Sequence, residues 1–117
     1  MADERTIVFE DDREAGRLRA VEEGLPVGFI AYFALAEEPR ALVAVHTIIE
    51  PGHEGRGIAG RLVEAFYAIA SAAGLSVVPL CPYAASWAAQ HPDLAPAATA
   101  ELVAAARAQL ASDSGLW

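Results

Sequence analysis

A glycine-rich segment between two apolar stretches carries the clearest chemistry in this chain. It reads Glu-Pro-Gly-His-Glu-Gly-Arg-Gly-Ile-Ala-Gly over residues 50–60 and joins a strand-like stretch to one with helical periodicity. A helix that begins after such a turn leaves backbone N–H groups without partners, and no Ser, Thr, Asp or Asn stands at this boundary to cap them. Such N–H groups favour an anion, so the sequence predicts a site for phosphate or pyrophosphate.

The same glycines also match the G-x-G-x-x-G fingerprint of dinucleotide-binding proteins, at Gly55, Gly57 and Gly60. That fingerprint needs an acidic residue about 20 positions further on to hold the ribose. The sequence there is Val-Pro-Leu-Cys, over residues 78–81, and the remaining chain is too short for a doubly wound sheet. The context therefore argues against a nicotinamide or flavin cofactor.

Four short strands are expected before the glycine-rich segment, joined by turns with acidic residues that are most simply solvated. We expect these strands at residues 6–9, 16–21, 26–33 and 41–49. The fourth is apolar on both alternating faces, which is typical of a central strand. A helix from residue 58, ended by Gly74, then leads to a fifth strand at 75–80, which should run parallel to the fourth.

Two further helices are expected after the fifth strand. A short one covers residues 83–91 with Trp87 as its anchor in the core, and an Ala-rich one covers residues 96–111. The second helix has a narrow apolar stripe that either packs on the sheet or forms a homodimer contact, and its residues are Leu102, Val103, Ala106 and Leu110. Pro79 lacks an N–H, so one flank of the fifth strand should be unpaired near its end. The sequence predicts one α+β domain over residues 1–117.

Composition limits the possible partners. The 117 residues carry a formal net charge of −8, without a basic patch that could displace counterions from nucleic acid. An acidic balance suits cationic substrates such as amines, and it is also a common means of solubility. The single cysteine excludes an internal disulfide, residues 1–5 lack the apolar core of a signal peptide, and no apolar run approaches the roughly 18 residues of a membrane span. We expect a cytoplasmic protein with no membrane, nucleic-acid or metal partner.

The order of these elements and several short motifs resemble the GNAT superfamily of N-acetyltransferases. That superfamily carries a Gln/Arg-x-x-Gly-x-Gly/Ala pyrophosphate loop at this junction, and here the pattern falls on residues 54–59, with Glu54 in place of Gln or Arg. Three motifs are more narrowly similar to a small single-domain GNAT-like family: His-Thr at 46–47, Gly-Arg-Gly-Ile-Ala at 55–59 and Leu-Cys-Pro at 80–82. The resemblance spans about residues 7–94 and implies a minimal GNAT-like fold.

The resemblance implies acetyl-CoA as the cofactor and an amine as the acceptor. The loop backbone would hold the pyrophosphate, and the pantetheine arm would lie between the fourth and fifth strands. The cofactor-binding residues that it implies are Thr47, Ile48, Ile49, Gly55, Arg56, Gly57, Ile58, Ala59, Gly60 and Arg61. Glu54 is expected to point outward, with Arg56 and Arg61 as compensating charges.

Three residues near the expected thioester are candidates for catalysis. His46 would take a proton from an ammonium substrate, or would serve a structural hydrogen bond in the sheet. Its expected face partners, which would desolvate it, are Leu42, Ala44 and Ile48. Cys81 is either a nucleophile for the acetyl group or a small buried apolar residue. Tyr83 either donates a proton to the leaving thiolate or simply packs.

Two functions remain open at this point. The first is an acetyl-CoA-dependent N-acetyltransferase acting on a small amine or a protein amino group. The second is a non-catalytic acyl-CoA-binding or protein-interaction module with a degenerate GNAT fold. Brevity favours the second, because larger relatives build acceptor pockets from additional N-terminal helices, whereas here the first strand leads directly to the second.

Overall fold

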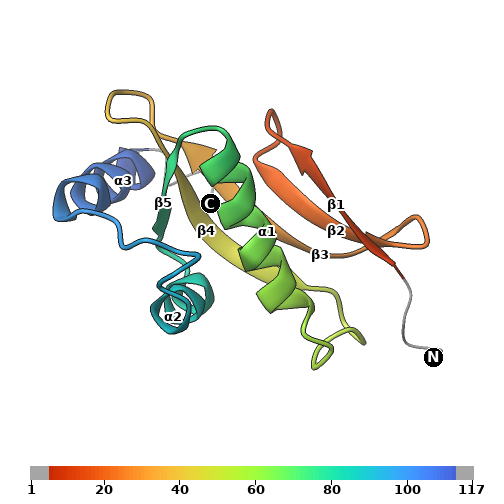
Figure 1. Cartoon of the computed structure of the whole chain (residues 1–117). Coiled ribbons are helices and arrows are strands. Elements are labelled where there is room, and N and C mark those ends of the chain that lie inside the picture. The colour runs from red at the N-terminus through yellow and green to blue at the C-terminus, as the bar shows by residue number, and fades with distance from the viewer. Residues whose placement is uncertain (1–5, 113–117) are drawn as a thin grey trace.

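The computed structural model describes residues 6–112, so residues 1–5, on which the signal-peptide argument depends, lie outside it. The described chain forms one five-stranded sheet in the order β1-β2-β3-β4-β5 and three helices (Figure 1). The strands are β1 (Ile7–Asp12), β2 (Arg17–Glu22), β3 (Leu25–Ala34), β4 (Ala41–Ile49) and β5 (Ser76–Pro79). The helices are α1 (Ile58–Ala72), α2 (Pro82–Gln90) and α3 (Ala100–Ser112).

The topology confirms the predicted α+β fold. Strands β1 to β4 form an antiparallel meander, and β5 runs parallel to β4 after the crossover through α1. Helix α1 ends where the sequence predicted, because Gly74 adopts a left-handed φ of 72° and the Leu75 N–H bonds back to the Ala70 carbonyl at 2.8 Å.

Strand β1 is longer than the sequence predicted. The acidic residues that were expected to end it continue the strand to Asp12, because β2 places arginines opposite them. Glu10 pairs with Arg19 and Asp12 pairs with Arg17, and an Arg19 nitrogen lies 3.5 Å from an Asp12 oxygen. Opposite charges across an antiparallel pair contribute roughly 0.2–1 kcal/mol each, enough to extend the pairing of a polar stretch.

Helix α1 covers one face of the sheet and forms the main core with it. Its buried side chains recur at helical spacing and are Ile58, Leu62, Val63, Phe66, Tyr67 and Ala70. The Phe66 ring meets the Tyr32 ring of β3 edge-on, with centroids 5.0 Å apart. The helix is thereby fixed across the sheet, and its N-terminal end lies beside the later part of β4 (Figure 1).

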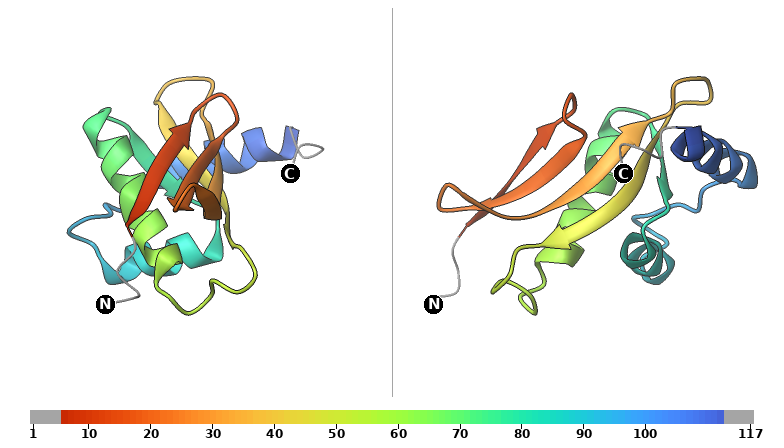
Figure 2. Two further views of the ribbon diagram at one scale, coloured as in Figure 1. Left: turned by 90° about the vertical axis from the view of Figure 1, so that its right-hand side faces the viewer. Right: turned by 180° about the vertical axis from the view of Figure 1, so that it is seen from behind.

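The opposite face of the sheet is only partly covered. Helix α3 packs its apolar stripe there, with Leu102 and Ala106 buried against Leu35, Val43 and Val78. This is the packing on the sheet that the stripe predicted. Seen from behind, β1 to β3 and the end of β4 have no helix in front of them within residues 6–112 (Figure 2, right). We call this part the open face.

A β-bulge interrupts β4. Ala31 of β3 pairs with His46, but the next residue, Tyr32, pairs with Ala44, so Val45 is an additional residue in β4. A bulge shifts the alternation of side chains by one residue. After the bulge, each side chain of β4 therefore lies on the face opposite to the one that the alternation of the first half would give it.

The bulge changes the environment of His46. Leu42 and Ala44 belong to the core under α1, and the shift directs Thr47 to that side while His46 and Ile48 face the open side. The prediction that Leu42 and Ala44 desolvate His46 is wrong, because the His46 side chain is exposed on the other face.

Candidate active site

Strands β4 and β5 separate about midway along β4. Their parallel register ends with Ala44 opposite Pro79. The next two N–H groups, those of Leu80 and Cys81, both donate to the Ala44 carbonyl at 3.0 Å, so the chain turns away from β4 instead of continuing the ladder. The strands part where Pro79 predicted an unpaired flank.

The later part of β4 faces this gap with its backbone. The Glu50 N–H donates to the Val27 carbonyl of β3 at 2.9 Å. The alternation of an antiparallel ladder then turns the backbone groups of Thr47 and Ile49 away from β3, towards the flank that β5 has left. An extended chain that contains amides could pair there as an added strand does at a sheet edge.

The glycine turn before α1 has the geometry of an anion site. Gly55 and Gly57 have left-handed φ values of 80° and 79°, which favour glycine. Gly57 is the N-cap of α1, no side chain caps it, and the first turn of the helix holds no acidic residue. A Cβ on either glycine would meet no atom within 4 Å, so the approach to the helix start is open.

Glu54, the departure from the superfamily pattern, is exposed. Its Oε1 accepts a hydrogen bond of 3.0 Å from the Gly52 N–H within the preceding turn. This agrees with the expectation that its carboxylate points away from the helix start.

Arg56 lies against β2. Its Nη1 and Nη2 donate to the two carboxylate oxygens of Glu22 at 3.1 and 2.5 Å. Nη1 also lies 2.7 Å from His53 Nδ1, which must accept, since a guanidinium only donates. Glu22 is only 5% exposed, although its place at a turn had suggested a solvated residue. The pair ties the glycine turn to the end of β2, a role that the sequence did not indicate.

Arg61 also has a contact outside the loop. Its guanidinium carbon lies 5.5 Å from the centre of the Phe9 ring in β1. The two arginines that were expected to compensate Glu54 are thus held against Glu22 and Phe9, which leaves backbone N–H groups as the main donors at the helix start.

Arg56→Ala is expected to lower the free energy of unfolding by about 2–3 kcal/mol, because it removes the bidentate ion pair of the buried Glu22 carboxylate. The Arg56 side chain is 29% exposed, so the loss should fall short of the roughly 3–5 kcal/mol typical of fully buried pairs. Urea unfolding measures it. Arg19→Ala is the matched control, since its pair with Asp12 is more exposed and should contribute at most about 1 kcal/mol. Equal losses of unfolding free energy in the two variants would contradict the conclusion that the Arg56–Glu22 pair ties the glycine turn to β2.

Cys81 and His46 lie on opposite faces of the sheet. Cys81 is 6% exposed within the core under α1, and its thiol donates to Thr47 Oγ1 at 3.4 Å. His46, the next residue before Thr47, projects to the open face. The fold therefore does not bring the two together as a nucleophile and its base.

Tyr83 lies at the start of α2, close to the first turn of α1. A Cβ built on Gly60 would lie 3.4 Å from the Tyr83 hydroxyl oxygen and 3.6 Å from Trp87 Nε1. Tyr83 is 46% exposed, so of the two alternatives its exposure favours proton donation over packing in the core. Its hydroxyl lies beside the first turn of α1. Trp87 packs against the core as expected, and its ring stacks on His91 with centroids 4.0 Å apart.

His46 lines a cavity of about 550 Å³ on the open face. Phe29, Phe33 and Ile48 form its apolar part. Because β4 borders the gap left by β5, this cavity lies beside the place where the two strands part.

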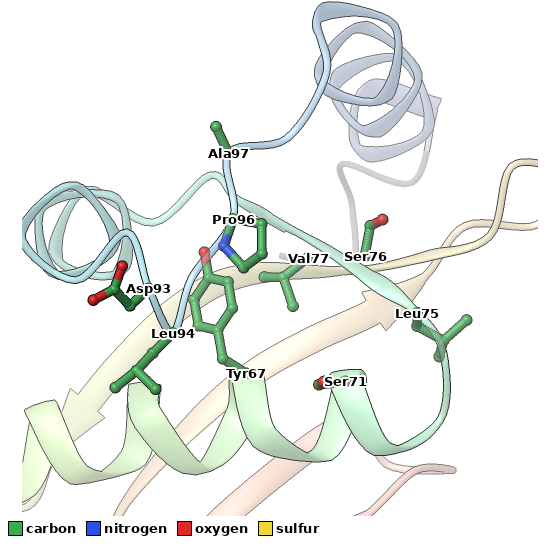
Figure 3. A pocket seen from close by; sticks show the side chains of 9 residues that line it. All are labelled: Tyr67, Ser71, Leu75, Ser76, Val77, Asp93, Leu94, Pro96 and Ala97. Atoms are coloured by element: carbon green, nitrogen blue, oxygen red, sulfur yellow. The ribbon is translucent and has the colours of Figure 1, made fainter.

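A second cavity, of about 220 Å³, lies between α1, β5 and the segment after α2 (Figure 3). The buried Tyr67 hydroxyl points into it and has no hydrogen-bond partner among the described residues. Burial raises the pKa of Tyr67 to about 12, so this hydroxyl is a donor at neutral pH. None of the predicted site residues lines the cavity. Within residues 6–112, no cluster of His, Cys, Asp or Glu could hold a metal ion, and no helix is long and apolar enough to cross a membrane.

Solved structures similar to this chain include an N-acetyltransferase and an integron cassette protein. A ribosomal-protein-alanine N-acetyltransferase from Brucella melitensis biovar Abortus 2308 is 27% identical, with a TM-score of 0.54 over 71% of this chain and 62% of its own. An integron cassette protein from V. cholerae is 16% identical, with a TM-score of 0.50 over 74% and 57%, a likeness of fold alone. This chain thus spans about three fifths of the length of each. No curated protein sequence matches it.

A family model described as GCN5-related N-acetyl-transferase matches residues 17–97. The match runs from β2 to the segment after α2 and leaves α3 outside. It includes the gap between β4 and β5, the glycine turn and the start of α2. The chain therefore belongs to the GCN5-related N-acetyltransferase family.

Proposed function

We propose that this protein transfers an acetyl group from acetyl-CoA to an amine. The observation that carries the proposal is the parting of β4 and β5 beside an uncapped glycine helix start. The gap offers a strand edge to the amides of a pantetheine arm, and the helix start offers N–H groups to a pyrophosphate. The open space over Gly55 and Gly57 fits this group, because a bulky phosphate can reach the backbone there.

The proposed binding residues fall into two sets. Thr47 and Ile49 provide the backbone groups of the strand edge for the pantetheine arm, and Ile48 lies between them with its own backbone groups towards β3. Backbone groups from Gly55 to Arg61, including those of Ile58, Ala59 and Gly60, surround the pyrophosphate. The side chain of Arg56 acts indirectly, by holding the turn on Glu22.

We favour direct transfer to the amine. Bound acetyl-CoA would supply an activated acetyl thioester. His46 takes a proton from the ammonium form of the acceptor, which makes the nitrogen nucleophilic. The Tyr83 hydroxyl, which lies beside the helix start, returns a proton to the released thiolate. The new C–N bond thus replaces the C–S bond. The acceptor nitrogen loses two protons: one passes to solvent through His46, and the other, released as the amide forms, restores the Tyr83 hydroxyl.

An acetyl-cysteine route through Cys81 is the less favoured alternative. It requires a thiolate at Cys81, and a base must remove the proton. The Cys81 thiol is buried and bonds to the Thr47 hydroxyl, which is not a base, while His46 lies on the other face. We therefore assign Cys81 to the wall of the thioester site.

A calorimetric titration with acetyl-CoA tests the proposal, with NADH as the control nucleotide. We expect acetyl-CoA to bind one equivalent, NADH not to bind, and addition of an amine to release free thiol. Absence of acetyl-CoA binding would contradict the proposal. Binding without thiol release from any amine would instead indicate a non-catalytic acyl-CoA-binding module.

A further inference from the structure

We infer that the acceptor is an amino carboxylate, with its amine at His46 and its carboxylate at Arg17. This inference rests on the proposed acetyltransferase function and names the substrate class of the same site. It follows from a row of three residues across the open face, from the surroundings of Arg17 and from the charges that line the cavity.

Arg17, Ala31 and His46 form a straight row across β2, β3 and β4. Arg17 is directly opposite Ala31, and Ala31 is directly opposite His46. Residues that are paired in this way share a face of the sheet. Two strand spacings separate the Cα atoms of Arg17 and His46 by about 10 Å. Ala31 itself is 1% exposed, and the space that a ligand could occupy is the cavity that the Arg17 and His46 side chains both line.

The row leads towards the expected thioester. His46 is on β4, the strand that borders the gap left by β5, whereas Arg17 is two strands away from it. Both side chains line the same cavity of about 550 Å³. A carboxylate held at Arg17 would therefore place an amine, several bonds further along, at His46 beside the gap.

Arg17 differs from the other arginines of β1, β2 and their turn. Arg13 lies 3.6 Å from Asp11, and Arg19 lies 3.5 Å from Asp12. Arg17 lies opposite Asp12 in the register, but the Asp12 carboxylate pairs with Arg19, and Arg17 forms no ion pair within residues 6–112. Its guanidinium carbon lies 4.5 Å above the centre of the Phe29 ring. Stacking on an aromatic face fixes the plane of the guanidinium and leaves its N–H edge for a carboxylate, which it can bind through two hydrogen bonds.

The charges that line the cavity favour an anionic group near β2. Two arginines, Arg13 and Arg17, line it together with one acidic residue, Glu14, which is exposed in the turn between β1 and β2. The net charge of −8 suggested cationic acceptors, but Arg17, which unlike Arg13 forms no ion pair within residues 6–112, places a positive charge at the β2 end of this cavity. An acceptor with a second positive charge would meet Arg17, and such a like-charge contact disfavours a polyamine.

Acetyl transfer to two matched series tests the inference. One series is linear ω-amino carboxylates, the other alkylamines of the same chain length, both followed by thiol release. We expect KM to be at least about 10-fold lower for the carboxylates, since a bidentate charged pair is among the stronger hydrogen-bonded contacts. Arg17→Ala should reduce this ratio towards 1, and Arg17→Lys should have an intermediate effect. Arg40→Ala, at an exposed position that does not line this cavity, is the control and should preserve the ratio within about 2-fold.

Several outcomes would overturn the inference. Equal KM values for the two series in the wild-type protein would do so. An Arg17→Ala variant in which KM rises by the same factor for both series would also do so. A preference for polyamines that Glu14→Gln removes would assign the cavity to cationic acceptors instead. The thiol-release assay on the same proteins separates the two proposals. Transfer to amines without carboxylate preference refutes only this inference, whereas no transfer to any amine refutes both. Calorimetry with acetyl-CoA checks that each variant still binds the cofactor.

Discussion

Gly57→Glu is expected to weaken acetyl-CoA binding at least about 100-fold while the domain remains folded. A carboxylate at this position would occupy the open space at the start of α1 and meet the pyrophosphate. Two like charges about 4 Å apart repel by roughly 4 kcal/mol in a partly shielded site, which corresponds to about 1,000-fold in affinity and exceeds the minimum stated. Calorimetric titration measures the affinity.

Gly24→Glu is the matched control for this variant. Gly24 has φ of 80°, close to the 79° of Gly57, and a Cβ there also meets no atom within 4 Å. Both substitutions should therefore lose about 1–2 kcal/mol of stability through the same left-handed backbone strain. Gly24 lies in the turn between β2 and β3, so acetyl-CoA binding should be unchanged. Unchanged affinity in Gly57→Glu would refute the pyrophosphate site.

His46→Ala is expected to lower kcat by about 100-fold or more, because general base catalysis of this kind contributes 10²–10⁴-fold. The affinity for acetyl-CoA should remain, since the imidazole faces the acceptor cavity and not the glycine turn. Cys81→Ala provides the comparison on the other face and should lower kcat less than about 10-fold if transfer is direct.

The reverse order of effects would favour the acetyl-cysteine route. In that case Cys81→Ala would abolish turnover, and a radiolabelled acetyl group would remain on the wild-type protein before the amine is added. Equal, small effects of both substitutions would remove both residues from the mechanism. Circular dichroism of each variant checks that the fold is retained.

The parts of the fold that local signals determine could be predicted from the sequence. The bounds of β4 and the start of α1 were predicted as the structure has them, because a β-branched run and a glycine turn are local features. The end of α1 at Gly74 depends on one residue with a left-handed backbone.

The features that the sequence did not predict depend on distant parts of the chain. The bulge at Val45 arises from the pairing of β4 with β3, and a one-residue shift reverses which face each later side chain occupies. Glu22 was assigned to a solvated turn because its partner, Arg56, is 34 positions away. The sequence left Tyr83 open between proton donation and packing, because only the arrangement of α2 against α1 determines its exposure.

The open face, which no helix covers within residues 6–112 (Figure 2, right), has a kinetic consequence for the proposed acceptor site. Enclosed sites surround most of a small ligand, whereas an acceptor that lies on β2 to β4 would keep one side in water. Its residence time should then be short compared with the chemical step, so that KM for the acceptor approximates a true dissociation constant. The protein would then select its acceptor by the contacts at Arg17 and His46. It would bind and release many molecules for each one that it acetylates.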